Sequence, residues 1–192
     1  FVREGGLVGS LNFGVMQRVN LGASMYFEEF IGTGRNIRMI RPDIQFKYRF
    51  FDGKGAVPAF AVGYDGQGYY YNWTDKKYQE KGKGMFVVAT RELLVPNLFF
   101  HPGLNVSDFD GSGLSAFMGA NYNIEDTVSL MAEWDNIHTL GDSRVNSGVR
   151  FYVTPFFQLD FAVREIGKTG TFSDGTSRRA ERVVQLKYIS NF

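Results

Sequence analysis

The stretch QLKYISNF (185–192) shows the pattern that decides the fold of this chain. Every second residue on one side of it is apolar except Ser190, and this set comprises Val184, Leu186, Tyr188 and Phe192. Most of the residues between them are polar. Successive side chains of a β-strand point to opposite faces of the sheet, so a repeat of two residues predicts a strand with one apolar and one polar face.

The same alternation recurs along the chain in about eleven segments of roughly ten residues, each bounded by Gly, Asn, Asp or Pro. The expected strands are 6–18, 21–30, 41–51, 58–70, 84–93, 98–108, 114–124, 127–137, 144–154, 157–167 and 182–192. Aromatic residues make up 16% of the chain and Gly occurs 23 times, which suits strands and tight turns. No shift in composition indicates a linker, so 1–192 is expected to form one domain.

The predicted connections alternate between short and long. The short ones are 19–20, 52–57, 95–97, 125–126 and 155–156; the long ones are 31–40, 72–82, 110–113, 138–143 and 168–181. All short turns then lie at one end of the sheet and all long loops at the other, which is typical of antiparallel up-and-down transmembrane β-barrels. Because single-chain bacterial barrels have even strand numbers, we expect about twelve strands. The twelfth is expected to precede Phe1 or to come from another chain, and a signal peptide is expected to be absent from this sequence.

Either face of such strands can point into the barrel in principle. Two features of the apolar face indicate that it covers the outer surface of the barrel. Its residues are mainly large, whereas a small barrel that fills its own interior mixes large and small side chains. Aromatic residues gather near strand ends, as in the interfacial girdles of membrane barrels. The predicted girdle consists of Phe50, Phe51, Tyr70, Tyr71, Trp134, Phe156 and Phe157.

The polar face is then expected to line a lumen. The charged residues predicted to face it are Lys47, Arg49, Asp65, Glu133, Asp135, Arg150, Asp160, Arg164 and Lys187. Two interpretations remain open at this point. The charges either pair across the lumen and hold the shape of the barrel, or line a pore and select among solutes.

The final strand resembles the C-terminal signature of bacterial outer-membrane β-barrels through Phe192, Tyr188 and Leu186. The resemblance implies a Gram-negative outer membrane, recognition by the barrel-assembly machinery, and contact with lipid and lipopolysaccharide. RPDIQFKYRFF (41–51), VPAFAVGYDGQGYYY (57–71) and GMFVVATREL (84–93) are also similar to barrels of exopolysaccharide and capsule operons. That likeness implies other outer-membrane or periplasmic proteins as partners.

Several functional classes are disfavoured by composition. The net charge of +1 shows no footprint of nucleic-acid binding, and an absence of Cys with only two His offers no metal cluster. Asp135 and His138 are the one pair that resembles acid–base chemistry, and no nucleophile motif accompanies them. We therefore predict a non-enzymatic barrel without metal or cofactor, acting as a narrow pore or as an accessory to surface polysaccharide export. The alternatives are a structural barrel that anchors partner proteins and a soluble ligand-binding barrel.

Overall fold

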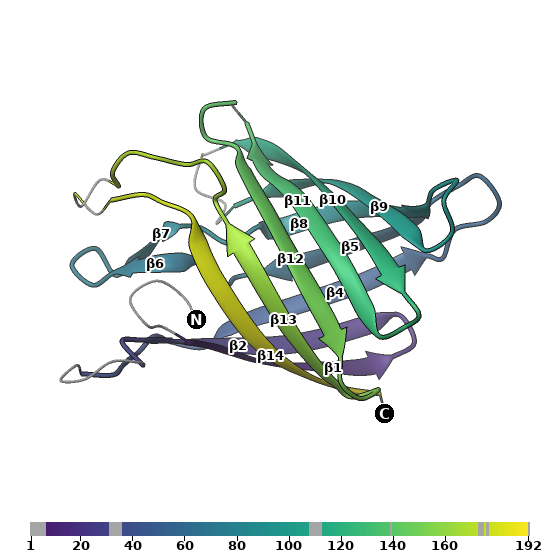
Figure 1. Cartoon of the computed structure of the whole chain (residues 1–192), viewed down its shortest axis with the longest axis horizontal. Helices are drawn as coiled ribbons and strands as arrows, with labels where there is room; N and C mark the ends of the chain where they lie inside the picture. The colour runs from purple at the N-terminus through teal and green to yellow at the C-terminus, as the bar shows by residue number, and fades with distance from the viewer. Residues whose placement is uncertain are drawn as a thin grey trace.

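Strands make up most of the computed structural model, which describes residues 7–30, 36–107, 113–138, 140–172, 175 and 177–191 (Figure 1). The strands are β1 (Leu7–Met16), β2 (Val19–Glu28), β3 (Arg38–Met39), β4 (Asp43–Phe51), β5 (Ala59–Asp65), β6 (Tyr69–Asn72), β7 (Lys77–Glu80), β8 (Gly84–Glu92), β9 (Leu98–Val106), β10 (Leu114–Ile124), β11 (Val128–Ile137), β12 (Arg144–Tyr152), β13 (Phe157–Arg164) and β14 (Glu181–Asn191). The described residues contain no helix long and apolar enough to cross a membrane.

The main sheet closes on itself into a barrel. Its order is β1-β14-β13-β12-β11-β10-β9-β8-β5-β4-β2-β3, and β1 also pairs with β2. Because the two-residue strand β3 pairs only with β2, eleven of the twelve strands form the wall. The prediction of an all-β barrel from eleven strands of this chain is therefore confirmed.

The closure differs from the predicted pattern. An odd number of alternating strands leaves the first and the last running in the same direction, so β1 pairs with β14 in parallel, from Val8–Gln185 to Gly14–Asn191. All other wall pairs are antiparallel. The sheet is thus mixed, and the expectation of a purely antiparallel barrel is wrong at this seam.

The connections between wall strands alternate as predicted. One end of the barrel, here the short-turn end, has connections 17–18, 52–58, 93–97, 125–127 and 153–156; the other, the long-loop end, has 29–42, 66–83, 107–113, 138–143 and 165–180. Most of the predicted turn 110–113 lies outside the described residues. At the tight turn between β10 and β11, Glu125 and Asp126 both have positive φ (47° and 53°), the geometry that a type I′ hairpin requires.

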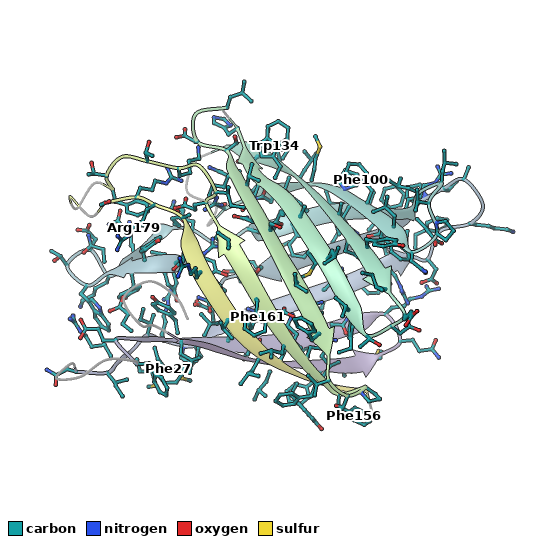
Figure 2. All side chains as sticks on the ribbon, in the orientation of Figure 1. Phe27, Phe100, Trp134, Phe156, Phe161 and Arg179 are labelled. Carbon is teal, nitrogen blue, oxygen red and sulfur yellow. The ribbon has the colours of Figure 1, made fainter. Side chains whose placement is uncertain are left out.

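Burial in this barrel is inverted relative to a water-soluble protein. The described residues include six buried hydrophobic residues, fifteen buried polar or charged residues and thirty-eight large hydrophobics that are exposed. In β13, Gln158 and Asp160 are buried while Phe157, Phe161 and Val163 are exposed, as the repeat of two residues requires. Phe161, Phe156 and Trp134 lie on the outer surface (Figure 2).

The predicted strand 58–70 is interrupted. β5 ends at Asp65, and residues 69–72 instead pair with 77–80 in a separate two-stranded sheet inside the connection 66–83. The Gly-Gln-Gly sequence at 66–68 causes the break. The backbone N–H of Gln67 turns back to Asp65 Oδ1 at 3.1 Å, and a Cβ at Gly68 would collide with the Tyr78 ring.

Candidate functional site

The β6–β7 hairpin folds against the inner wall at the long-loop end. Three hydrogen bonds join the connection 66–83 to β2 and β4. The Ser24 hydroxyl donates to Gln67 Oε1 at 2.7 Å, the Trp73 indole N–H donates to Glu28 Oε2 at 2.6 Å, and the Tyr78 hydroxyl donates to Asp43. Below the hairpin, the buried side chains of Val8, Tyr26 and Ile40 pack against Tyr69, Tyr71 and Tyr78.

Tyr69 connects the hairpin with the interior of the barrel. Its ring lines both large cavities of the lumen, one of about 490 Å³ and one of about 530 Å³. The Arg164 guanidinium lies 3.3 Å from the centroid of the ring, a cation–π contact that comes from the opposite wall strand β13. The Tyr69 side chain therefore lies between the two main spaces of the lumen.

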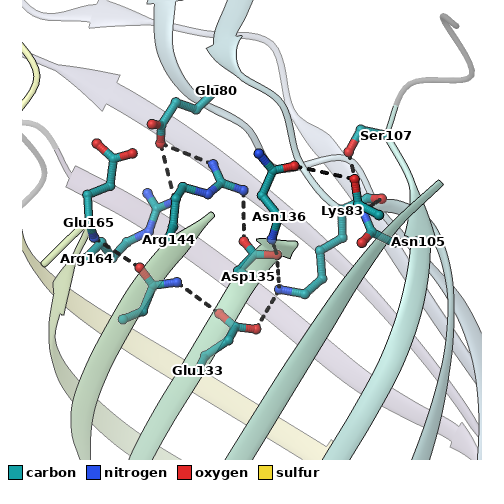
Figure 3. A network of polar contacts seen from close by, with 12 residues as sticks. Glu80, Lys83, Asn105, Ser107, Glu133, Asp135, Asn136, Arg144, Arg164 and Glu165 are labelled. Atoms are coloured by element: carbon teal, nitrogen blue, oxygen red, sulfur yellow. Dashed lines mark hydrogen bonds and ion pairs between the residues drawn. The ribbon is translucent and has the colours of Figure 1, made fainter. Parts of the chain in front are cut away.

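Glu80, at the end of β7, joins the hairpin to three arginines, two of which, Arg144 and Arg164, are labelled in Figure 3. Its carboxylate lies 3.4 Å from Arg144, 3.6 Å from Arg164 and 3.4 Å from Arg178. These arginines come from β12, from β13 and from the connection 165–180, which lie far from Glu80 in the sequence. Glu80 thus anchors the hairpin to the opposite side of the barrel.

Each arginine also has a second carboxylate partner from the wall or its loops. Arg144 Nη2 donates to Asp135 Oδ2 at 2.8 Å, and these two residues face each other in the register of β11 and β12. The other two pairs are Arg164 with Glu181 at 3.3 Å and Arg178 with Glu165 at 2.6 Å.

Lys83 extends the network across the mouth toward β11. Its ammonium donates to Glu133 Oε1 at 2.6 Å and lies 3.8 Å from Asp135 (Figure 3). It also lies 5.0 Å from the centroid of the Phe117 ring. The other Glu133 oxygen accepts a hydrogen bond from the Asn146 amide at 3.1 Å. Lys83 precedes the first residue of β8, so the network fixes both the end of the hairpin and the wall strand that follows it.

Glu80 and Glu165 form a buried carboxylate pair within this network, with 5% and 0% of their surfaces exposed. Burial, together with a hydrogen bond to Glu165, raises the pKa of Glu80 to about 8. Burial alone would also raise the pKa of Glu165, but the proton of Glu80 and the Arg178 guanidinium hold it below its usual value. Around this pair, each cation of the network has a further carboxylate partner: Lys83, Arg144, Arg164 and Arg178 pair with Glu133, Asp135, Glu181 and Glu165, respectively.

The nine charged residues predicted to face the lumen have the following places. The 490 Å³ cavity is lined by Glu133, Arg150, Asp160 and Arg164, the 530 Å³ cavity by Lys47, Asp65 and Lys187, and a smaller cavity of about 260 Å³ by Lys47 and Arg49. Asp135 belongs to the network at the mouth. Arg150 and Asp160 form a bidentate pair with two contacts of 2.7 Å, while Arg49 pairs at 2.8 Å with Asp52 in the short-turn connection 52–58.

Six network residues lie outside the sequence prediction: Glu80, Lys83, Arg144, Glu165, Arg178 and Glu181. They lie in the long connections or at strand ends, where no alternation marks their direction. The position of Arg144 could have been predicted from the sequence. Asp135 and Arg144 flank the connection 138–143, so hairpin pairing alone would have placed them opposite each other.

Five of the seven predicted girdle residues are exposed: Phe50, Phe51, Trp134, Phe156 and Phe157. The other two are not on the outer surface. Tyr70 and Tyr71 belong to the hairpin, where the Tyr70 ring lies 4.7 Å from Phe172 and the Tyr71 ring 5.3 Å from Tyr78. They lie in the hairpin and not on a wall strand, because β5 ends at Asp65 and the chain turns at Gly66. Of the predicted C-terminal signal, Leu186 and Tyr188 are exposed, and Phe192 lies outside the described residues.

Asp135 and His138, the pair that resembles acid–base chemistry in the sequence, each have other partners in the structure. Asp135 is bonded to Arg144 and Lys83, whereas His138 Nδ1 lies 3.3 Å from the Leu114 carbonyl oxygen. The described part of the chain has no group of three or more His, Cys, Asp or Glu that could hold a metal ion. Protein-family models, curated proteins and solved structures contain no match to this chain.

Proposed function

We propose that this barrel spans a bacterial outer membrane as a narrow pore without chemistry of its own, restricted at one end by the β6–β7 hairpin. The inverted burial is the observation that supports it most. Fifteen polar or charged residues are buried among the described residues, while large apolar side chains such as Phe46, Phe151 and Phe161 are exposed on the wall. Soluble monomers rarely expose apolar patches above a few hundred Å², whereas lipid stabilises such a surface.

The character of the lumen supports a pore for small polar solutes. Its three cavities, of about 490, 530 and 260 Å³, share lining residues and are bordered by amides, hydroxyls and charges. Barrels of about eight strands are filled by side chains and those of about sixteen hold an open channel, so eleven strands suit a narrow passage. The hairpin at the long-loop end then sets the width of that passage.

The resemblance of three segments to barrels of exopolysaccharide and capsule operons supports a role beside surface-polymer export. Lys76, Lys77 and Arg179 are exposed on the long connections, where they would meet acidic lipopolysaccharide. The soluble alternative has less support. An apolar ligand needs an apolar interior, and the six buried hydrophobic residues form two separate small clusters.

Replacing Phe161 by Arg tests the membrane proposal. Phe161 lies in the middle of β13 with 45% of its surface exposed, so a charge there would face lipid hydrocarbon. We expect the free energy of folding into phospholipid vesicles to weaken by about 2–4 kcal/mol. The matched control is Leu140→Arg, in the connection 138–143, where the side chain is 78% exposed and no loss is expected. If Phe161→Arg folds as well as wild type, or if wild type folds in water without detergent or lipid, the barrel is not a membrane protein.

A further inference from the structure

The charges of the lumen are distributed unevenly among its cavities. In the 490 Å³ cavity under the hairpin, Arg150 and Arg164 balance Glu133 and Asp160. The 530 Å³ cavity has Lys47 and Lys187 against Asp65, a formal charge of +1. The 260 Å³ cavity at the short-turn end has Arg18, Lys47 and Arg49 without a lining carboxylate, a formal charge of +3. The excess of positive charge therefore lies in the 530 Å³ and 260 Å³ cavities, which share Asn20 and Lys47.

Ion pairs with Asp52 neutralise part of the positive charge of the 260 Å³ cavity, but they do not involve Lys47. Arg18 and Arg49 both pair with Asp52 at the rim of the short-turn end. Within the described ranges, Lys47 has neither an ion pair nor a side-chain hydrogen bond, although it lines both the 530 Å³ and the 260 Å³ cavities. Asn20 faces Lys47 in the register of β2 and β4, lines the same two cavities, and its amide likewise has no partner in the described part of the chain.

Lys187 supplies a second such cation from another part of the wall. It lies on β14, two strands away from β2 across the β1 seam, and lines the same 530 Å³ cavity as Lys47. It too has no ion pair or side-chain hydrogen bond to any described residue. Lys47 is open to the cavity and Lys187 is half-buried, so two cations without protein partners face one space, which favours a solute that brings negative charge.

The groups between the two lysines indicate what else the ligand carries. The Gln45 amide donates to Ser24 at 2.8 Å and the Gln185 amide donates to Ser10 at 3.0 Å, and all four residues line the cavity. Amides and hydroxyls both donate and accept hydrogen bonds, which complements the hydroxyl groups of a polar solute. A space of about 530 Å³ is within the usual range for a small-molecule site.

We propose that this cavity binds an anionic, hydroxyl-rich solute of monosaccharide size, with its acidic group at Lys47 and Lys187 and its hydroxyls at Asn20, Gln45 and Gln185. The proposal names the solute class of the proposed pore and therefore rests on that function. Because Lys47 also lines the 260 Å³ cavity at the short-turn end, the site also gives the pore a preference for anions at that end.

Calorimetric titration of the full chain, folded in detergent micelles, tests the site with glucuronate as the probe. Glucose is the matched neutral sugar, because it lacks the carboxylate. We expect glucuronate to bind and glucose not to bind. Lys47→Gln and Lys187→Gln should each weaken glucuronate binding about tenfold, the size of one lost charge-assisted hydrogen bond. Lys54→Gln, at an exposed position of the 52–58 turn, should leave it unchanged.

Equal binding of glucose and glucuronate, or unchanged glucuronate binding in the double variant Lys47→Gln/Lys187→Gln, would overturn the proposal. Recording wild-type channel steps in a planar bilayer, from the same preparation, distinguishes failure of the proposed binding site from failure of the proposed pore. Channel steps without glucuronate binding would refute the site and leave the pore standing. Glucuronate binding that depends on the two lysines, without channel steps, would support the site and refute the pore.

Discussion

Replacing Arg144 by Gln is expected to lower the free energy of unfolding of the barrel by about 3 kcal/mol. Arg144 is 9% exposed and lies between Asp135, at 2.8 Å, and Glu80, at 3.4 Å. Removing the guanidinium leaves the Asp135 carboxylate buried with only the more distant Lys83 cation, and an uncompensated buried charge is costly. Urea unfolding of the protein in lipid vesicles, followed by tryptophan fluorescence, measures the change.

Arg179→Gln is the matched control for this experiment. Arg179 lies in the connection 165–180 next to Arg178, but its side chain is exposed and has no ion pair among the described residues (Figure 2). Exposed charges of this kind contribute little, so a change below about 0.5 kcal/mol is expected. If Arg144→Gln and Arg179→Gln unfold at the same urea concentration as wild type, the network at the mouth does not stabilise the fold.

Replacing residues 69–80 by a short Gly-Ser linker is expected to raise the single-channel conductance severalfold. The exchange removes the Tyr69 ring from between the two large cavities and releases Glu80 from the far wall. The wall itself does not depend on the hairpin, because β5 and β8 pair directly from Ala59–Thr90 to Asp65–Gly84. Planar-bilayer recording of wild type and variant provides the comparison.

The barrel should survive this exchange because the arginines released from Glu80 keep their carboxylate partners outside the hairpin, Asp135, Glu165 and Glu181. A double variant with Lys76→Gln and Lys77→Gln alters only the exposed part of the same hairpin and should conduct like wild type. An unchanged conductance in the linker variant would show that the hairpin does not restrict the lumen.

The wall of the barrel was predictable because each strand encodes its own two faces. The alternation of Gln158 and Asp160 with Phe157 and Phe161 is local information, and it specifies both the strand and the side of the sheet that each residue occupies. The short turns were predictable for the same reason. Closure was not, since the alternating pattern of β1 and β14 is the same whether the two strands pair in parallel or antiparallel.

The hairpin and its network depend on contacts that no local pattern encodes. Glu80 and Arg178 are 98 residues apart in the sequence, and Tyr69 meets Arg164 from another part of the chain. Locally, Tyr69, Tyr70 and Tyr71 continue the aromatic pattern of the preceding strand, so the sequence predicts a girdle at the end of that strand. No local pattern indicates that the chain turns away from the wall at Gly66. Arg178 lies in a connection without alternation, so the sequence does not indicate where its side chain points.

The membrane-spanning barrel is tested most directly by fluorescence quenching in vesicles made of lipids with brominated acyl chains. The chain has two tryptophans, so Trp73→Phe and Trp134→Phe give matched proteins with one each. Trp134 is exposed on the outer surface of β11, whereas Trp73 lies in the connection 66–83 and donates to Glu28. We predict strong quenching of Trp134 and much weaker quenching of Trp73; a Trp134 emission unaffected by bromine would contradict insertion of this barrel into the bilayer.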